Sequence, residues 1–392
     1  METLRIALVD LDARFGGGQI ALGNMAYSLS KKGHEVHLLL GVKNIPERLI
    51  KLCSTNCYLH QKLGYSDLIH MRKNIEQISD YILKLHRTLR FDVINAQGIN
   101  GILIPKSLQD RLVVTLHGNN LQRGLNLLNF SCKNSEIRQA IPGALKNFFK
   151  NLFGHFLYAK LEKKACENAK LVVTLTPTEA YYAKKYYSIS GHKIRIVPNA
   201  IIDLNENRSE LIRIPEPKKV ILSVGALEFI KGTPILARAM RYVLASTENV
   251  IYVSVGDGPL MNYVRELRAE FPKKVIIFNK VFDGLSSIYA RSSAFVQGSL
   301  YEALSLSMAE AMLAGKPVVA FGLASIPDLV VDNLTGYLAK PACSRDLAIK
   351  TLSLISNEEK MLEMGFNARK TVDKLCSVEV VGNSMQRIMK EV

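Results

Sequence analysis

The sequence has few cysteines and lacks several patterns that would mark other classes of protein. Its 392 residues include six cysteines, and none of them stands in Cys-x-x-Cys spacing. We see no metal site in this scatter, and reduced thiols in a cytoplasmic protein are the plain interpretation. No uncharged apolar run approaches the roughly 18 residues that a membrane span needs. The first residues lead straight into a strand-like run, so we expect no secretory signal peptide.

Acidic residues are scarce in the first half of the chain. Of the net charge of +16, +14 lies in residues 1–200, which hold 28 Lys and Arg against 14 Asp and Glu. A basic surface confined to one half of a chain favours an anionic partner there, such as a phospholipid surface, a lipid phosphate or nucleic acid. The alternative is a solvated face that is merely rich in lysine.

The chain opens with a strand, a group of glycines, a helix and a second strand. The strand pattern Leu4–Val9 precedes Gly16, Gly17 and Gly18, and the second strand is Glu35–Leu40. This is a Rossmann-type opening, in which glycines let the backbone approach a ligand closely. Because the glycines do not form a true G-x-G-x-x-G, they give little support to dinucleotide binding. We interpret the segment as a loop that closes over a phosphate or a sugar.

Two series of alternating strands and helices divide the chain, whose 392 residues fit two domains. The polar segment 201–219, which holds two prolines, is the best linker candidate. We therefore predict an N-terminal domain over 1–200, a C-terminal domain over 220–375 and a last helix, about 376–392, packed back on the first domain. A ligand is expected in the cleft between the domains. The strands predicted after the first two are Asp92–Ala96, Leu112–Leu116, Leu171–Leu175, Ile194–Val197, Val220–Val224, Val250–Val255, Lys274–Phe278, Ala294–Gln297 and Val318–Phe321.

The stretch Ser299–Phe321 carries the strongest functional pattern. A strand end is followed by small residues, a helix that bears Glu310, and another strand. In an open α/β sheet this arrangement binds anions, because free N–H groups and the helix dipole point at the ligand. Glu310 would accept hydrogen bonds from sugar hydroxyls, while Glu302 precedes the helix and acts separately. The stretch therefore predicts a nucleotide held by phosphate and ribose at once.

Two other features have both a functional and a structural interpretation. His117 follows a strand directly, at the sheet edge where α/β sites are built, and we favour a functional role over a structural one. The segment Lys146–Lys164 places phenylalanines and leucines on one helical face with lysines around it. Such a helix suits the interface of an anionic bilayer. The alternative, which we favour slightly, is a core helix with a solvated edge.

Nine short motifs together resemble the family-4 retaining glycosyltransferases of the GT-B fold, along nearly the whole chain. Each motif alone is weak, but nine in the right order are strong evidence. The resemblance implies an α/β architecture of two Rossmann-like domains facing across a cleft. The motifs are Gly16-Gly17-Gly18, GHEV at 33–36, TLHG at 115–118, VPNA at 197–200, VGALEFIKG at 224–232, GDGPL at 256–260, the stretch between Glu302 and Glu310, GKPVVA at 315–320 and DNLTGYL at 332–338.

The resemblance implies a role for each matching residue of the second domain. Glu310 would hold the ribose hydroxyls of a sugar nucleotide, and Glu302 would contact the donor sugar. Lys231 would stabilise the leaving diphosphate, where negative charge develops. Backbone near Gly225 and the N–H groups of three residues at the helix start would meet the donor. Those three residues are Leu304, Ser305 and Leu306.

The first domain would supply further contacts, and one family feature is missing. Gly17 and Gly18 resemble the loop against the donor phosphates, and His117 resembles the residue beside the transferred sugar. The family usually has an arginine five residues before its lysine, where this chain has Ala226. Losing a guanidinium from a diphosphate site costs a few kcal/mol unless another cation replaces it. Our candidate for that cation is Arg14.

The expected activity is transfer of a hexose from a nucleoside diphosphate sugar to an acceptor hydroxyl with retention of configuration. We expect no metal and no cofactor, because Lys231 and helix dipoles supply the positive charge. The acceptor we hypothesise is a lipid-linked or membrane-surface glycan, with the enzyme peripheral on the inner face of the membrane and no nucleic acid as partner. The alternatives are a catalytically weak binding subunit and a sugar-nucleotide epimerase or phosphorylase. The nucleotide base, the sugar, the linkage and the oligomeric state are left open.

Overall fold

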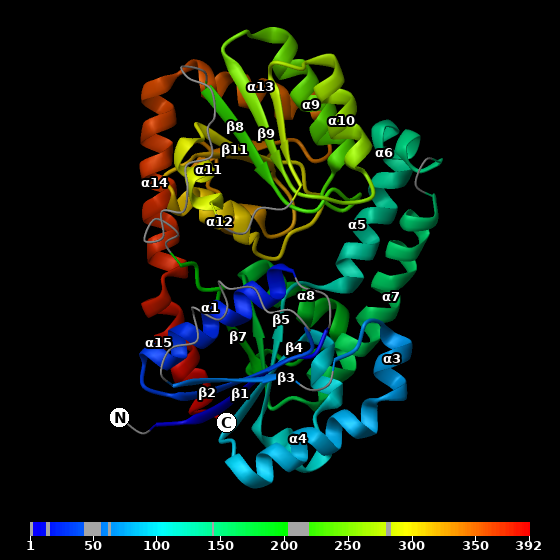
Figure 1. Ribbon diagram of the computed structural model, residues 1–392, viewed down its shortest axis with the longest axis vertical. Helices are drawn as coiled ribbons and strands as arrows, with labels where there is room; N and C mark the ends of the chain where they lie inside the picture. The colour runs from blue at the N-terminus through cyan, green and yellow to red at the C-terminus, as the bar shows by residue number, and fades with distance from the viewer. Residues whose placement is uncertain are drawn as a thin grey trace. The chain divides into compact units, whose positions relative to one another are not determined.

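The computed structural model describes residues 3–12, 16–42, 56–61, 64–142, 145–202, 219–279 and 284–392. The chain divides into two compact units (Figure 1). Unit 1 comprises Met1–Leu121, Phe156–Ile202 and Leu375–Val392, and unit 2 comprises Gln122–His155 and Asp203–Lys374. Each unit is built on one parallel β-sheet. The predicted α/β class with two Rossmann-like sheets is thus confirmed.

Unit 1 holds a seven-stranded sheet with the order β3-β2-β1-β4-β5-β6-β7. All described neighbours run parallel. The central strands are continuous apolar runs, as expected where helices cover both faces of a sheet. Two separate clusters of buried apolar side chains form the core. The strands are β1 (Arg5–Asp10), β2 (Glu35–Leu40), β3 (Cys57–Gln61), β4 (Val93–Gln97), β5 (Leu112–Leu116), β6 (Leu171–Thr174) and β7 (Ile194–Ile196).

The helices of unit 1 pack their apolar faces on this sheet. α1 (Gly17–Lys31) and α15 (Val378–Met389) lie together, and Met385 of α15 is fully buried with Met25 and Leu29 in one core cluster. The end of the chain therefore completes the core that its beginning starts. The other helical elements are α3 (Leu68–Lys73), α4 (Ile75–Leu89), α8 (Pro177–Tyr187), η1 (Gly98–Leu103), η2 (Lys106–Arg111) and η4 (Gly191–Lys193).

Unit 2 holds a six-stranded parallel sheet with the order β10-β9-β8-β11-β12-β13. The chain order reverses beside β8, so β8 and β11 are neighbours whose carboxyl ends open at a topological switch point, the place where such sheets bind ligands. The strands are β8 (Lys219–Val224), β9 (Val250–Val255), β10 (Val275–Phe278), β11 (Ala294–Gln297), β12 (Val318–Phe321) and β13 (Gly336–Ala339). The helical elements are α9 (Thr233–Ser246), α10 (Met261–Glu270), α11 (Leu285–Arg291), α12 (Leu306–Leu313), α13 (Ser344–Ser356), α14 (Glu358–Cys376) and η6 (Ile326–Asp328).

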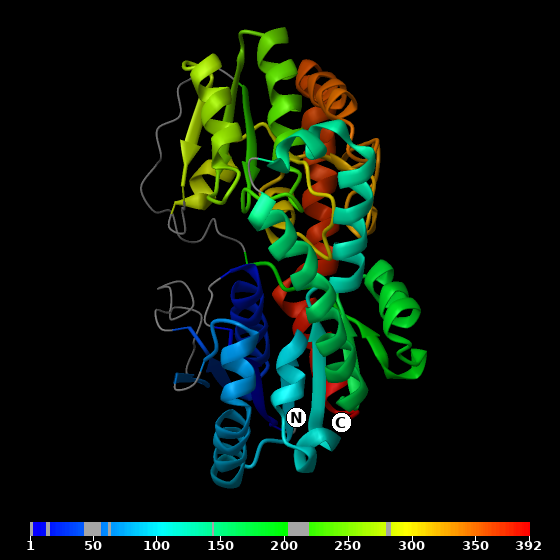
Figure 2. The same cartoon turned by 90° about the vertical axis from the view of Figure 1, so that its right-hand side faces the viewer.

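Residues 122–155, which we call the helical arm, also belong to unit 2. The arm comprises most of α5 (Asn120–Lys133), all of α6 (Ser135–Ala140) and the first part of α7 (Leu145–Asn168). α6 packs against α9, and the arm's helices lie side by side in both views (Figures 1 and 2). The domain boundary proposed at residue 200 assigned this segment to the first domain, whereas its contacts are made with the second. α7 itself continues from unit 2 into unit 1.

Two strands were not predicted from the sequence, and most of the predicted linker cannot be compared with the structure. β3 and β13 each lie at an edge of their sheet. β3 is only partly buried, which weakens its apolar pattern, and the four residues of β13 begin with a glycine. Most of the proposed linker 201–219 lies outside the described residues. Across the described part of the chain, no helix is both long and apolar enough to span a bilayer. The five cysteines found there are free thiols.

The helix predicted over Lys146–Lys164 has its apolar residues on two sides, not on one face. Phe148 and Leu152 are buried, whereas Phe149, Phe153 and Leu157 are exposed by 44%, 67% and 43%. Spacings of four residues place the exposed three in one stripe along α7. The core interpretation thus holds for one side of the helix, the other side presents apolar surface, and the membrane interpretation stays a prediction.

Candidate active site

The loop after β8 carries Lys231 and is held close to the end of β11 by two glycines. Gly232 has a φ of +62°, and a Cβ atom on it would lie 1.8 Å from the carbonyl oxygen of Gly298. A side chain at either contact would push the two loops apart. Gly232 is the N-cap of α9, which begins at Thr233 with Pro234 in its first turn, so Lys231 stands just before a helix N-terminus.

An open pocket lies between the carboxyl ends of β8 and β11. Gly225, Ala226 and Lys231 line it from the β8 side, and Gln297 and Ser299 line it from the β11 side. The pocket therefore sits at the switch point of the sheet. Its lining includes the position where Ala226 replaces the expected arginine.

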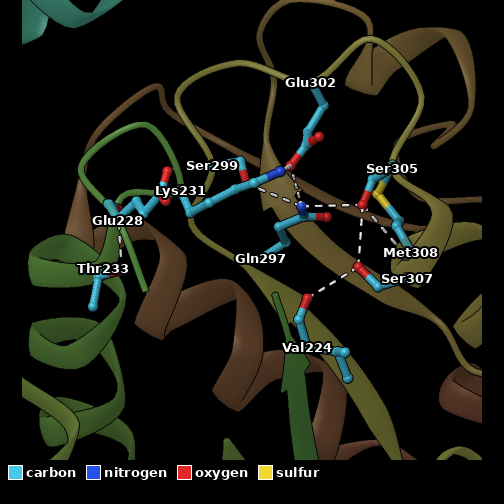
Figure 3. A network of polar contacts seen from close by, with 10 residues as sticks. All are labelled: Val224, Glu228, Lys231, Thr233, Gln297, Ser299, Glu302, Ser305, Ser307 and Met308. Atoms are coloured by element: carbon cyan, nitrogen blue, oxygen red, sulfur yellow. Dashed lines mark hydrogen bonds and ion pairs between the residues drawn. The ribbon is translucent and has the colours of Figure 1, made fainter. Parts of the chain in front are cut away.

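An ion pair between Lys231 and Glu302 is the centre of this site (Figure 3). Lys231 Nζ lies 2.7 Å from Glu302 Oε1. The same carboxylate oxygen accepts hydrogen bonds from Ser299 Oγ at 2.7 Å and from Gln297 Nε2 at 2.6 Å. Glu302 is buried, and such hydrogen bonds offset the loss of hydration of a buried carboxylate. The structure thus brings together two of the predicted catalytic residues, Lys231 and Glu302.

The N-terminus of α12 borders the same site. Ser305 is the N-cap residue and accepts a hydrogen bond from the backbone N–H of Met308 at 3.4 Å, so Leu306 is the first helical residue. Ser307 Oγ donates to the carbonyl of Val224 at 3.0 Å, which ties the helix start to the end of β8. The positive end of the helix dipole therefore lies by the pocket-lining strand. Leu304 is the last residue before the cap.

Glu310 stands further along α12 and is buried. Its Oε2 accepts a hydrogen bond from the hydroxyl of Tyr289, itself almost fully buried, at 3.1 Å. Tyr289 thus orients a carboxylate that would otherwise be costly to bury. The two glutamates lie in separate environments, as expected for residues that contact different parts of one ligand.

In unit 1 the glycines form the start of a helix. Gly17 and Gly18 lie in the first turn of α1, not in a loop before it, and Gly17 is exposed. Gln19 links this turn to the sheet, because its Oε1 accepts from the Gly16 N–H at 2.9 Å and its Nε2 donates to Asp10 Oδ2 at 2.8 Å. Burial raises the pKa of Asp10 to about 7, although three hydrogen bonds oppose the shift. Arg14 lies outside the described residues.

His117 follows β5 directly, as predicted. Its Nε2 lies 2.7 Å from Gln97 Oε1 at the end of β4. Because Gln97 uses its own N–H group to donate to Asn95, the imidazole Nε2 carries the proton and donates to Gln97. Gly118 follows with a φ of +130°, which turns the chain away from the sheet. Gln97 thus orients the His117 ring at the carboxyl edge of the sheet of unit 1.

Two family models match successive parts of the chain. The model described as Glycosyltransferase Family 4 matches residues 15–203, and the model described as Glycosyl transferases group 1 matches residues 205–371. The chain belongs to these glycosyltransferases. The resemblance inferred from the nine motifs is therefore confirmed.

Curated relatives of this glycosyltransferase act on different acceptors. N-acetyl-alpha-D-glucosaminyl L-malate synthase of Bacillus anthracis is 21% identical over 96% of this chain and 94% of its own length. Lipopolysaccharide 1,2-N-acetylglucosaminetransferase of Salmonella typhimurium is 25% identical over 57% of this chain and 62% of its own length. Their names show a small-molecule acceptor in one case and a lipopolysaccharide in the other.

Solved structures establish the fold of this glycosyltransferase. The Anabaena protein HepE, crystallised with UDP-glucose, superposes with a TM-score of 0.71 at 17% identity, covering 99% of this chain and all of its own. At this identity the likeness concerns the fold alone, which is GT-B.

Sequence reasoning missed the hydrogen-bonding partners of the two glutamates. Gln297, Ser299 and Tyr289 were not among the predicted site residues of this glycosyltransferase. A signal for Gln297 exists in the sequence, because it is a polar residue at the end of an apolar strand, five positions before Glu302. For Tyr289 there was none, since its contact with Glu310 depends on how α11 packs against α12.

Proposed function

We propose that the protein is a retaining hexosyltransferase that takes its sugar from a nucleoside diphosphate sugar. The observation that carries the proposal is the Lys231–Glu302 ion pair beside a pocket at the sheet's switch point. A cation and a helix N-terminus suit a diphosphate, and a carboxylate suits sugar hydroxyls.

Each residue of the site has one role in the proposed reaction. Lys231 and the N–H groups at Leu304, Ser305 and Leu306 stabilise the charge that develops on the diphosphate as its bond to the sugar C1 breaks. The acceptor oxygen bonds to C1 on the same face, and its proton passes to the leaving phosphate. Glu302 orients the sugar. Positive charge thus comes from the protein, and we propose that no metal takes part.

Glu310, Gly225 and the residues predicted in unit 1 have further roles in the proposal. Glu310, oriented by Tyr289, accepts hydrogen bonds from the ribose hydroxyls, and the backbone at Gly225 lies against the donor. We assign the exposed first turn of α1, with Gly17 and Gly18, to the donor phosphates because its N–H groups suit an anion. His117 contacts the transferred sugar, and Arg14 replaces the arginine missing at Ala226.

Release of nucleoside diphosphate tests the proposal. The protein is incubated with UDP-glucose, UDP-galactose, UDP-N-acetylglucosamine and GDP-mannose, with and without EDTA. No acceptor is added, so water takes the sugar in this assay, and one donor should give slow, steady release of diphosphate and free sugar that EDTA leaves unchanged. Lys231→Ala should lower kcat about 100-fold to 1,000-fold, the usual effect of removing one charge-stabilising group, and Glu310→Ala should raise the donor KM or abolish release. Lys340→Ala, an exposed lysine of the same unit, serves as control.

The rival proposal is a binding subunit without catalytic activity, and the absence of an arginine at position 226 is its basis. A binding subunit without activity would show donor-induced thermal stabilisation with no release from any donor. A sugar-nucleotide epimerase would return an epimerised donor. Either result would contradict transfer.

We further propose a lipid-linked or membrane-surface glycan as acceptor, with the enzyme peripheral on the inner face of the membrane. The support is the exposed stripe of Phe149, Phe153 and Leu157 on α7. Exposed lysines on the same side of the helix, Lys146, Lys150 and Lys160, match it with positive charge. Apolar side chains among lysines suit the interface of an anionic bilayer. The basic first half of the chain adds to this attraction.

A further inference from the structure

The helical arm touches the segment that leads into Glu302. Asn126 Nδ2 donates a hydrogen bond of 2.8 Å to the carbonyl of Leu300. One turn earlier on α5, the guanidinium of Arg123 lies 5.2 Å from the centre of the Tyr301 ring, a cation–π contact. Both Leu300 and Tyr301 are buried. Two side chains of α5 therefore fix the two residues that immediately precede Glu302.

The arm also touches the loop that carries Lys231. The ring of Phe148 on α7 packs edge-on against the ring of Phe229, with centroids 5.4 Å apart. Phe229 is fully buried and stands two residues before Lys231. Between these contacts, the backbone N–H of Leu300 donates to the carbonyl of Ile230 at 2.8 Å and joins the two loops directly. The arm thus supports both loops at the point where they meet.

We propose that Asn126 and Arg123 are positioning residues for the Lys231–Glu302 ion pair, so that the arm sets the catalytic geometry of the donor site. The inference rests on the proposed function of that pair. Neither residue needs to touch substrate. They act through the Leu300–Tyr301 backbone, and a shift of about 1 Å at a reacting group can cost about 100-fold in rate.

A second set of contacts holds the arm in place independently. Asn134 Nδ2 donates to the carbonyl of Ala342 at 2.6 Å. Glu136 accepts a hydrogen bond from Ser344 Oγ at 2.6 Å and lies 3.6 Å from Arg238 Nε. Ala342 and Ser344 are distant in sequence from both site loops, and Arg238 lies on α9, outside the Lys231 loop. The arm should therefore stay attached to unit 2 when the Asn126 contact is removed. The effect of Asn126 on the geometry of the ion pair can then be measured apart from its effect on the attachment of the arm.

The test compares two amide-to-carbonyl hydrogen bonds of the arm. Asn126→Ala removes the bond to Leu300, and Asn134→Ser removes the bond to Ala342 while keeping an oxygen to cap α6. We expect kcat for diphosphate release to fall at least 10-fold in Asn126→Ala with donor KM changed less than 2-fold, and to stay within 2-fold of wild type in Asn134→Ser. Arg123→Ala should also lower kcat, and Arg123→Lys should restore part of it because it keeps a cation over Tyr301.

Hydrogen exchange in full-length protein gives a readout apart from activity. Amide exchange in residues 299–305 should be faster in Asn126→Ala than in wild type and unchanged in Asn134→Ser. If the two variants behave alike in both rate and exchange, the arm only attaches and the inference is wrong, while the proposed function stands. If wild-type protein releases diphosphate from none of the donors, the proposed function is wrong, and the inference that rests on it is wrong too.

Discussion

Asp10, the last residue of β1, is a buried carboxylate of unit 1. Burial raises its pKa to about 7 from 3.8, against hydrogen bonds from the Asp12 N–H, Asn100 and Gln19. A pKa that is higher in the folded state than in the unfolded chain means that ionisation opposes folding. Ionisation of Asp10 therefore lowers the free energy of unfolding as the pH rises from about 4 to about 7.

This linkage predicts the effect of Asp10→Asn. The stability difference between the variant and wild type should shift in favour of the variant between pH 4 and pH 7, by up to about 4 kcal/mol for three pKa units. Far-UV circular dichroism during urea unfolding measures it at each pH. Asp110→Asn, an exposed carboxylate of the same unit, should show no such shift. Parallel pH profiles for Asp10→Asn and wild type would contradict the linkage.

At the scale of single residues, the sequence predicted the charged residues of the site better than the side chains that form hydrogen bonds with them. Lys231 and Glu302 were predicted from the resemblance to the family's motifs, and the structure pairs them directly. The hydrogen bonds of Gln297 and Tyr289 depend on which strand ends and helices become neighbours. Gln297 could be predicted from its place at the end of an apolar strand, but the contact of Tyr289 with Glu310 joins two separate helices and could not.

The exposed stripe of α7 makes a prediction at the scale of one element. Flotation with vesicles containing anionic phospholipid at low salt should recover wild-type protein in the lipid fraction, and Phe153→Ser should reduce that recovery several-fold because apolar burial and charge attraction act together. Phe366→Ser is the matched control, since Phe366 is also highly exposed but lies on α14. No flotation of wild-type protein, or equal loss in both variants, would sink the membrane proposal.

The two-sided character of α7 also shows what a helical pattern cannot decide. Seven phenylalanines and leucines lie within Lys146–Lys164, and they cover much of the circumference of the helix. Which of them are buried depends on external partners: Phe148 meets Phe229, while Phe153 meets Phe149 of its own helix. The sequence could predict the helix but not its buried side.

For the whole molecule, the packing of α15 on α1 ties the two ends of the chain together. Met385 has no exposed surface and lies in the core cluster of unit 1. Met385→Ala should lower the free energy of unfolding by about 2–5 kcal/mol, the usual cost of a buried large-to-small change. Urea unfolding would measure the loss, with the exposed Lys390→Ala as control. A loss below about 1 kcal/mol would mean that the cluster does not depend on α15.

The number and type of the sheets could be predicted, but the division of the chain between the units could not. Buried-strand runs alternating with helices indicate parallel sheets wherever they occur. The membership of the arm depends instead on contacts such as Asn126 with Leu300, which are 174 residues apart. Local patterns carry no information about such pairs, and the boundary at residue 200 followed the linker composition alone.

Unit 2 is built from two separate segments of the chain, and this affects how chimeras of such enzymes should be made. A chimera joined within 201–219 would combine the arm of one parent with the Leu300 and Phe229 loops of the other. Such a chimera would therefore not receive unit 2 of either parent intact. An exchange that respects the contacts would transplant residues 122–155 together with residues 219–374, so the natural recombination unit of this chain is discontinuous.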